Sequence, residues 1–267
     1  INSGPSMAPV GGNFYLNNLK NINNAIITDL GGTTFDISLI KDGKIPRTHE
    51  TWIGQKYRGH MTGFPSVDVR SIGAGGGSIA WVDDGGLLHV GPQSAGSKPG
   101  PSCYDNGGKN PTVTDAALVC GILNPKYFLG GELILNPSKA RKSINKIAKK
   151  LNMSNYETAI SILEVVTENM AQEIKNLTIH QGFNPSQSAL IAGGGASGIN
   201  IVNLAKKLDC KVILIPNLGP VLSAAGAMIA DITNEFSITM PVTTKNINFS
   251  KINTTVRSLR QKCEKFI

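Results

Sequence analysis

The residues of this sequence that could carry out chemistry are, first, two carboxylates on either side of a glycine pair, in "DLGGTTFD" (residues 29–36). Asp29 follows an apolar run and Asp36 lies seven residues later, at the start of another. Gly31 and Gly32 allow a sharp turn whose backbone amides point one way, and such amides bind phosphate. A carboxylate such as Asp29 could hold Mg²⁺ through water or orient an attacking water. The alternative is a tight turn that binds nothing.

The rest of this motif supplies hydroxyl groups and the second acid. Thr33 and Thr34 can each donate a hydrogen bond to a phosphate oxygen. We expect Asp36, on the strand that follows, to point back and cap the turn. The motif therefore predicts a phosphate site, with Asp29 as the catalytic and metal-binding residue.

A second glycine-rich run, "IAGGGASG", lies between a predicted strand and a predicted helix, and its glycines are Gly193, Gly194, Gly195 and Gly198. Their spacing matches the dinucleotide fingerprint. However, the next strand runs into Pro216 without ending in an acid, and the segment comes late in the chain. We therefore favour a loop that accepts an adenosine. A purely structural turn is the alternative.

A third glycine-rich run, "SIGAGGGS", lies between two strand-like segments. Gly75, Gly76 and Gly77 are consecutive, and Ser78 follows them. A backbone without side chains lets a substrate or a phosphate come close. We interpret these four residues as a candidate substrate site, with a bulged loop between strands as the equal alternative.

The remaining reactive side chains give weaker indications. The histidines lack a second histidine or a carboxylate at metal-ligand spacing, so we expect them to be structural or at the surface: His49, His60, His89 and His180. Cys103 lies in "GPSCYD", but a nucleophilic thiol needs a nearby base, and the sequence identifies none. The four cysteines form no CxxC pair, which argues against a zinc cluster or a disulfide scaffold and predicts a reducing cytoplasm.

The elements that must position these residues follow from periodicity and turn signals. Strands are predicted over residues 24–29, 34–41 and 44–50, and a hairpin over 78–82 and 87–90. A short helix begins near Thr114 or Asp115, and longer ones begin at Pro137 and Ser154. The chain closes with strand, helix, strand and helix over residues 188–192, 197–208, 211–215 and 222–231, which predicts parallel strands.

This order of elements is that of one lobe of an actin-like (ribonuclease H-like) ATPase fold, an α/β class with a mixed sheet and flanking helices. We assign the nucleotide-binding lobe to residues 1–50 and 109–240, and a β-rich and loop-rich insertion to residues 51–108. Residues 241–267 read as the truncated start of a C-terminal segment. The chain begins without methionine, at Ile1, so we expect it to be a piece of a longer polypeptide.

Composition limits the functional classes. Hydrophobic residues make up 40% and charged residues 16% of the 267 positions, as in a globular protein. The net charge of +8 indicates a solvated basic face. No basic patch is interleaved with aromatic residues, so we predict no nucleic-acid partner. No apolar run reaches membrane-spanning length and no signal peptide opens the chain, so we predict no membrane partner and a cytoplasmic location.

Several stretches, in this order, resemble the hydantoinase A and 5-oxoprolinase family, which includes the acetone carboxylase beta subunit. They are "SGPSMAPVGG", "DLGGTTFDISLIKDG", "SIGAGGGSIAWVD", "VGPQSAGSKPGPSCY", "PTVTDAALV" and "GGGASG". The resemblance extends from Ser3 to about Ile232. It implies the actin-like fold, the use of ATP with Mg²⁺, and phosphorylation of the oxygen of a lactam or cyclic imide. In the carboxylase branch a ketone or bicarbonate is activated instead.

The resemblance also implies roles and partners. Asp29, Gly31, Gly32, Thr33 and Asp36 fall on the second phosphate motif of the family, and Gly193 to Gly195 on its adenosine loop. A second, hydantoinase B-type subunit or domain often completes the reaction. Heat-shock chaperone ATPases and activators of radical dehydratases offer a non-enzymatic alternative on the same fold, but this chain lacks the clustered cysteines of those activators.

Two departures from the family pattern affect these expectations. The family has an earlier "D-x-G-G-T-x-T-D" motif in its other lobe, and this chain has one such motif only. We therefore expect that this chain lacks the N-terminal lobe and needs that lobe as a partner. We also expect the isolated chain to bind nucleotide weakly and to be inactive. Phe35 departs from the more common Ser-Thr-Asp version of this motif and places an apolar ring near the predicted phosphate turn.

Overall fold

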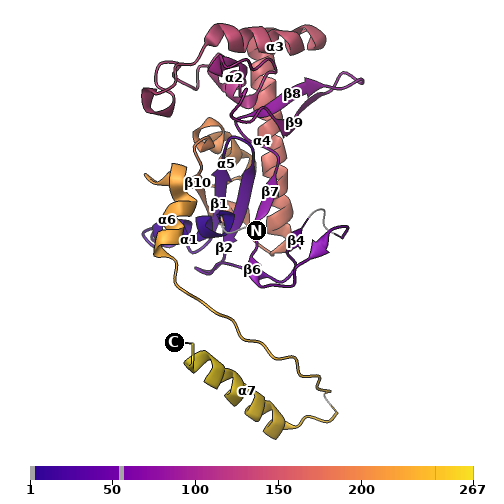
Figure 1. Ribbon diagram of the computed structural model, residues 1–267, viewed down its shortest axis with the longest axis vertical. Helices are drawn as coiled ribbons and strands as arrows, with labels where there is room; N and C mark the ends of the chain where they lie inside the picture. The colour runs from indigo at the N-terminus through magenta and orange to yellow at the C-terminus, as the bar shows by residue number, and fades with distance from the viewer. Residues whose placement is uncertain (1–3, 54–56, 244, 267) are drawn as a thin grey trace. The chain divides into compact units, whose positions relative to one another are not determined.

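The computed structural model describes residues 4–53, 57–243 and 245–266. Contacts within the chain divide it into two compact units, Ile1–Ile229 and Ala230–Ile267, and each is described by itself. The first unit contains a mixed sheet with helices on both faces, and the second contains one helix (Figure 1).

The secondary structure is as follows. The strands are β1 (Ala25–Leu30), β2 (Phe35–Ile40), β3 (Arg47–Thr48), β4 (Trp52–Ile53), β5 (His60–Met61), β6 (Ser66–Val67), β7 (Arg70–Ile72), β8 (Ser78–Val82), β9 (Leu88–Ser94), β10 (Ala189–Gly193) and β11 (Val212–Leu214). The helices are α1 (Ala8–Leu16), α2 (Val113–Val119), α3 (Pro137–Leu151), α4 (Asn155–His180), α5 (Ile201–Leu208), α6 (Leu222–Ile229) and α7 (Phe249–Glu264).

The central sheet has the strand order β11-β10-β1-β2-β7. β1, β10 and β11 run parallel, whereas β2 is antiparallel to both β1 and β7. The parallel strands that the closing part of the sequence predicts are therefore confirmed, as is the mixed character of the sheet. The carboxyl ends of β1 and β10 lie at the same edge of the sheet, and the segments that follow both strands are glycine-rich.

Alternation along β1 and β2 creates two different faces. Ile26 and Phe35 contribute to the larger core cluster, together with residues of α2, α4 and α5. Ile27 and Ile40 contribute to the smaller cluster, together with residues of α1 and α6. Because side chains alternate along a strand, Asp29 lies on the same face as Ile27. The acidic side of the sheet therefore faces the layer of α1 and α6.

The longer helices begin where the sequence predicts. α4 starts after Ser154, whose hydroxyl and Glu157 form a capping box, and α3 has Pro137 in its first turn after the Asn136 cap. The hairpin β8–β9 is confirmed as well. The short helix predicted near Thr114 and Asp115 is confirmed as α2: it begins at Val113, and Thr112 is its N-cap, in a capping box with Asp115.

The strand predicted over residues 44–50 is shorter than expected: β3 covers residues 47–48 of that range and lies outside the central sheet. After β2 the chain makes a single bridge between Lys41 and Lys44, and then β3 pairs with β6 outside the central sheet. Pro46, which has no N–H group to donate to a ladder, lies between these two pairings. The place beside β2 is taken by β7, from the middle of the range that the sequence assigns to the insertion. The insertion boundaries themselves stay a prediction.

Helix α1 was not among the predicted elements. Its sequence, "APVGGNFYL", contains a proline and two glycines, which argue against a helix on propensity alone. Packing explains both glycines: a Cβ on Gly11 would lie 2.7 Å from the carbonyl oxygen of Leu222, and one on Gly12 would lie 2.6 Å from Ile27. Tertiary contact with α6 and the sheet therefore overrides the local preference.

In the second unit, the side chain of Asn248 caps α7 by accepting from the amide of Lys251. None of the helices in the described parts of the chain combines the length and the apolar character needed to cross a membrane.

Candidate functional site

Four residues form a row across the sheet, one on each of four neighbouring strands. In the strand register Ser71 lies opposite Asp36, Asp36 opposite Asp29, and Asp29 opposite Gly193. Paired residues of adjacent strands project to the same face, so the two carboxylates and the serine hydroxyl are neighbours. The hydroxyl of Ser71 donates to Asp36, and the hydroxyl of Ser223, on α6, donates to Asp29 across 2.9 Å.

The two acids have different surroundings. Burial raises the pKa of Asp36 above its ordinary value; the hydrogen bond from Ser71 opposes this rise, and the charge of Asp29 adds to it. Among the described residues, the hydrogen-bond partner found for Asp36 is Ser71, on the neighbouring strand. The expected role of Asp36 in capping the turn therefore stays a prediction.

The turn after β1 is narrow and open to solvent. The amide of Gly31 donates to the carbonyl oxygen of Thr34 across 3.1 Å, which closes the turn. Gly32, Thr33 and Thr34 are exposed. The amides and hydroxyls expected to bind a phosphate therefore lie at the surface, directly after the strand that carries Asp29.

The loop of residues 75–78 lies beneath this turn. Gly76 and Gly77 donate from their amides to the carbonyl oxygens of Gly31 and Gly32, across 3.1 and 2.6 Å. A Cβ on Gly75 would lie 2.6 Å from the backbone of Gly32 and of Thr33. All four residues of the loop are buried. Their contacts hold the turn of residues 31–34 in place. A contact of this loop with substrate, and phosphate binding by the turn itself, stay predictions.

The loop after β10 meets the end of β1 from the other side. Gly194 has a φ of +84°, and a Cβ there would lie 2.3 Å from the carbonyl oxygen of Leu30. The same carbonyl accepts from the amide of Ala196 across 3.0 Å. Gly193 is buried, whereas Gly195 is exposed with open space around it. All three glycine-rich runs of the sequence therefore converge at one end of β1.

The donor set limits the metal that would fit. Within the described residues, no group of three or more His, Cys, Asp and Glu side chains could hold a metal ion. Two carboxylates on one face do suit Mg²⁺, which keeps several waters and is usually shared with substrate phosphates. Asp29 and Asp36 are therefore the residues that would hold it.

The histidines and Cys103 lie outside this site, with one correction. His89 is not isolated: its Nε2 lies 2.6 Å from Asp83 within the hairpin β8–β9, and its ring stacks on Trp81. Cys103 is buried, its amide donates to Asp115 across 2.7 Å, and burial raises the pKa of its thiol. A thiol held in its neutral form is a poor nucleophile.

Comparison with known proteins adds evidence on the family and the fold of the chain. The profile of the family described as Hydantoinase/oxoprolinase matches residues 1–236. The chain belongs to this hydantoinase/oxoprolinase family. Over 265 residues it is 38% identical to caprolactamase subunit alpha of Pseudomonas jessenii, a match that covers 98% of this chain and 37% of the relative. It is 39% identical over 238 residues to the acetophenone carboxylase gamma subunit of Aromatoleum aromaticum, covering 88% of this chain and 32% of the relative.

A solved structure supports the same family membership. The crystal structure of ATP-dependent caprolactamase from Pseudomonas jessenii matches with a TM-score of 0.83 and 37% identity, over 99% of this chain and 38% of that one. The predicted actin-like ATPase fold is confirmed by this match. The chain thus spans roughly a third of the length of these family members.

The sequence alone did not indicate the two serines that donate hydrogen bonds to Asp36 and Asp29. Ser71 is the first residue of the third glycine-rich run, and Ser223 is the second residue of α6, the last helix of the first unit. Although Ser71 lies in a glycine-rich run that is visible in the sequence, nothing local to that run indicates its partner Asp36, which is 35 residues away. Ser223 is 194 residues from Asp29 in the sequence, and no local pattern connects the two.

The raised pKa of Asp36 predicts a pH effect on stability. Between its ordinary pKa of 3.8 and the raised value, the folded protein binds more protons than the unfolded chain, so stability falls as pH rises through that window. Asp36→Asn removes this loss. We expect urea unfolding from about pH 4 to about pH 7 to show wild type losing stability relative to the variant. Ser71→Ala should steepen the loss, because it removes a bond to the charged form. Parallel curves for wild type and Asp36→Asn would contradict the assignment.

Proposed function

We propose that this chain provides the phosphate-binding part of an ATP-dependent hydrolase that opens a cyclic amide of the hydantoin, 5-oxoproline or caprolactam type. The observation that carries the proposal is the convergence of the three glycine-rich loops on the end of β1, beside Asp29 and Asp36. Membership of the hydantoinase/oxoprolinase family and similarity to a caprolactamase subunit support it.

The residues of the site take the following roles in this proposal. The amides of Gly32 and Thr33 and the hydroxyls of Thr33 and Thr34 bind the phosphates of ATP. Asp29, oriented by the hydroxyl of Ser223, faces the transferred phosphate. Mg²⁺, when bound at Asp29, would neutralise the charge that develops on the phosphate oxygens. The loop of Gly193, Gly194 and Gly195 accepts the adenosine.

The amide carbonyl must be activated before water can attack it, because an amide reacts slowly with nucleophiles. Resonance between nitrogen and the carbonyl group makes the carbonyl carbon a poor electrophile. In the proposed reaction the carbonyl oxygen attacks the γ-phosphorus of ATP, and ADP leaves. Water then adds to the activated carbon and the ring C–N bond breaks, which leaves an acyl phosphate. A second water attacks the carbonyl carbon of this acyl phosphate, and inorganic phosphate departs with the original carbonyl oxygen. The site supplies position and charge for the first step.

The chain requires partners in this proposal. It spans roughly a third of its matched relatives, two of which are named as subunits. We propose that an N-terminal lobe forms the other wall of the nucleotide cleft and that a hydantoinase B-type subunit completes ring opening. A substrate that contacts the loop of residues 75–78 would then shift the turn of residues 31–34, because the two are joined by backbone hydrogen bonds.

An isotope experiment tests the reaction. The complete protein and its partner are given ATP and a cyclic amide labelled with ¹⁸O at the carbonyl, in unlabelled water. We expect ring opening to depend on ATP and the label to appear in inorganic phosphate, because the phosphorylated oxygen leaves with the phosphate. Ring opening that consumes no ATP would overturn phosphorylation of the carbonyl oxygen, and ATP-dependent ring opening with all of the label retained in the carboxylate would overturn the departure of phosphate with that oxygen.

A ketone carboxylase is the second candidate. The similarity to the acetophenone carboxylase gamma subunit favours it, since that relative is 39% identical, although over a shorter part of the chain than the caprolactamase subunit. Supplying an aromatic or aliphatic ketone with labelled bicarbonate distinguishes the two. Labelled carboxylate formation with no ring opening of any cyclic amide would assign the chain to the carboxylase branch.

A further inference from the structure

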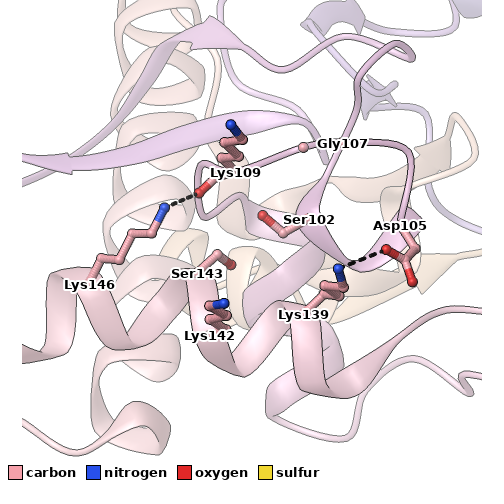
Figure 2. Close-up of a pocket in the computed structure, with 9 residues that line it drawn as sticks. Ser102, Asp105, Gly107, Lys109, Lys139, Lys142, Ser143 and Lys146 are labelled. Carbon is pink, nitrogen blue, oxygen red and sulfur yellow. Dashed lines mark hydrogen bonds and ion pairs between the residues drawn. The ribbon is translucent and has the colours of Figure 1, made fainter.

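A basic pocket lies apart from the glycine loops, between α3 and the loop before α2 (Figure 2). Its volume is about 540 Å³. It is lined by Ser102, Asp105, Gly107, Gly108, Lys109, Lys139, Lys142, Ser143 and Lys146. None of these residues belongs to the phosphate turn or to the other two glycine runs. We call this hollow the α3 pocket.

The charge of the α3 pocket is strongly unbalanced. Lys139, Lys142 and Lys146 recur along one side of α3, where a helix repeat of 3.6 residues aligns them, and Figure 2 shows them along the loop that carries Lys109. Asp105 is the one acidic residue in the lining. The lining therefore carries four ammonium groups against a single carboxylate.

Two of these lysines already have protein partners that hold them in place. Lys139 lies 3.2 Å from Asp105, and Lys146 donates to the carbonyl oxygen of Lys109 across 2.8 Å. For Lys142, in contrast, no hydrogen bond or ion pair is found among the described residues. The ammonium group between two positioned lysines is thus free to bind a ligand.

The loop side of the pocket adds backbone donors. Gly107 has a φ of +89°, and a Cβ on Gly108 would lie 2.2 Å from the carbonyl oxygen of Gly100, so the loop is held tightly. The amides of Gly107, Gly108 and Lys109 donate to none of the acceptors in the described parts of the chain. Successive free amides in a turn with positive φ are typical of anion-binding loops.

We propose that the α3 pocket binds a multiply charged phosphate compound, such as a diphosphate or a phosphate ester. Lysine is a compact charge with three donors and a frequent phosphate ligand, whereas planar recognition of a carboxylate favours arginine, which the lining lacks. The volume exceeds that of a single phosphate, and four cations match more than one negative group. The inference does not depend on the proposed catalytic function.

Calorimetric titration of the chain with inorganic diphosphate, at low ionic strength, tests the proposal. We expect saturable binding that weakens with added salt, and at least about tenfold weaker binding after the double substitution Lys142→Gln and Lys146→Gln. Arg141→Gln is the control for charge and is compared with Lys142→Gln alone, because each of these two variants removes one positive charge from α3. Arg141 projects roughly 100° away from Lys142 and is not part of the lining.

The outcomes separate the α3 pocket from other anion sites. Unchanged binding in the double variant would place diphosphate elsewhere, for example at the phosphate turn, and would overturn the proposal. If Arg141→Gln weakened diphosphate binding as much as Lys142→Gln, the binding would depend on net charge and not on the α3 pocket, which would overturn the proposal. Citrate binding as tightly as diphosphate would contradict the preference for phosphate. Equal thermal midpoints of wild type and all three variants would show that folding is unaffected.

Discussion

Asp29→Asn is expected to lower ATP turnover of the complete protein at least about 100-fold without unfolding it. Asparagine has nearly the same shape, and its carbonyl oxygen can still accept from the hydroxyl of Ser223. What disappears is the negative charge at the end of β1, beside the phosphate turn. The variant therefore separates the chemical role of the carboxylate from its structural role.

The control for this experiment is Asp42→Asn. Asp42 is exposed in the turn after β2 and has a φ of +50°, which asparagine tolerates well. We expect steady-state turnover of this variant to equal that of wild type. If Asp29→Asn also retained turnover near wild type, Asp29 would have no part in the mechanism, and the row of acids would be a structural feature of the sheet.

The parts of the fold that depend on local patterns could be predicted from the sequence. β1 is a buried apolar run, and β2 alternates in part and is followed by a clear turn at Asp42-Gly43. α4 has both a capping box and helical spacing. The parallel arrangement of β10 and β11 followed from strands that alternate with helices. In each case the information lies within a few residues, where short-range physics decides the outcome.

The parts that depend on distant contacts could not be predicted in this way. β7 has three residues and no alternation to identify it, yet it completes the sheet beside β2. The bond between Ser223 and Asp29 joins the last helix of the first unit to the first strand. Each of the three glycine-rich runs can be identified in the sequence, but only the order of the strands in the sheet shows that they lie together. Long-range pairing of short, glycine-rich segments leaves little signal in local periodicity.

The α3 pocket could not be predicted either, because the spacing of charges along one helix does not show which segment packs opposite them. The lysines of α3 read as an ordinary solvated face, because a helix repeat alone cannot reveal what lies opposite. In the fold, the loop that begins at Ser102 runs along that face, and Lys109 joins the three lysines of the helix. A basic stripe therefore becomes a concave site only through a loop whose position the sequence does not specify.

A large stability effect is expected at Gly194. Alanine there would need a φ of +84° and would place its Cβ 2.3 Å from the carbonyl oxygen of Leu30. That carbonyl also accepts from Ala196, so moving it breaks the link between the loop and β1. We expect Gly194→Ala to lower the free energy of unfolding by about 2–3 kcal/mol. Thermal unfolding should show a midpoint roughly 5–10 °C lower.

The adjacent glycine provides the matched control for this effect. Gly195 is exposed, does not have a positive φ, and has open space where a Cβ would lie, so Gly195→Ala should leave the midpoint almost unchanged. The pair thus compares one added methyl group at two consecutive positions of the same loop. Equal midpoints for the two variants would mean that the loop after β10 is not held against Leu30. The convergence of the three glycine runs, on which the proposed phosphate site rests, would then lose one of its three members.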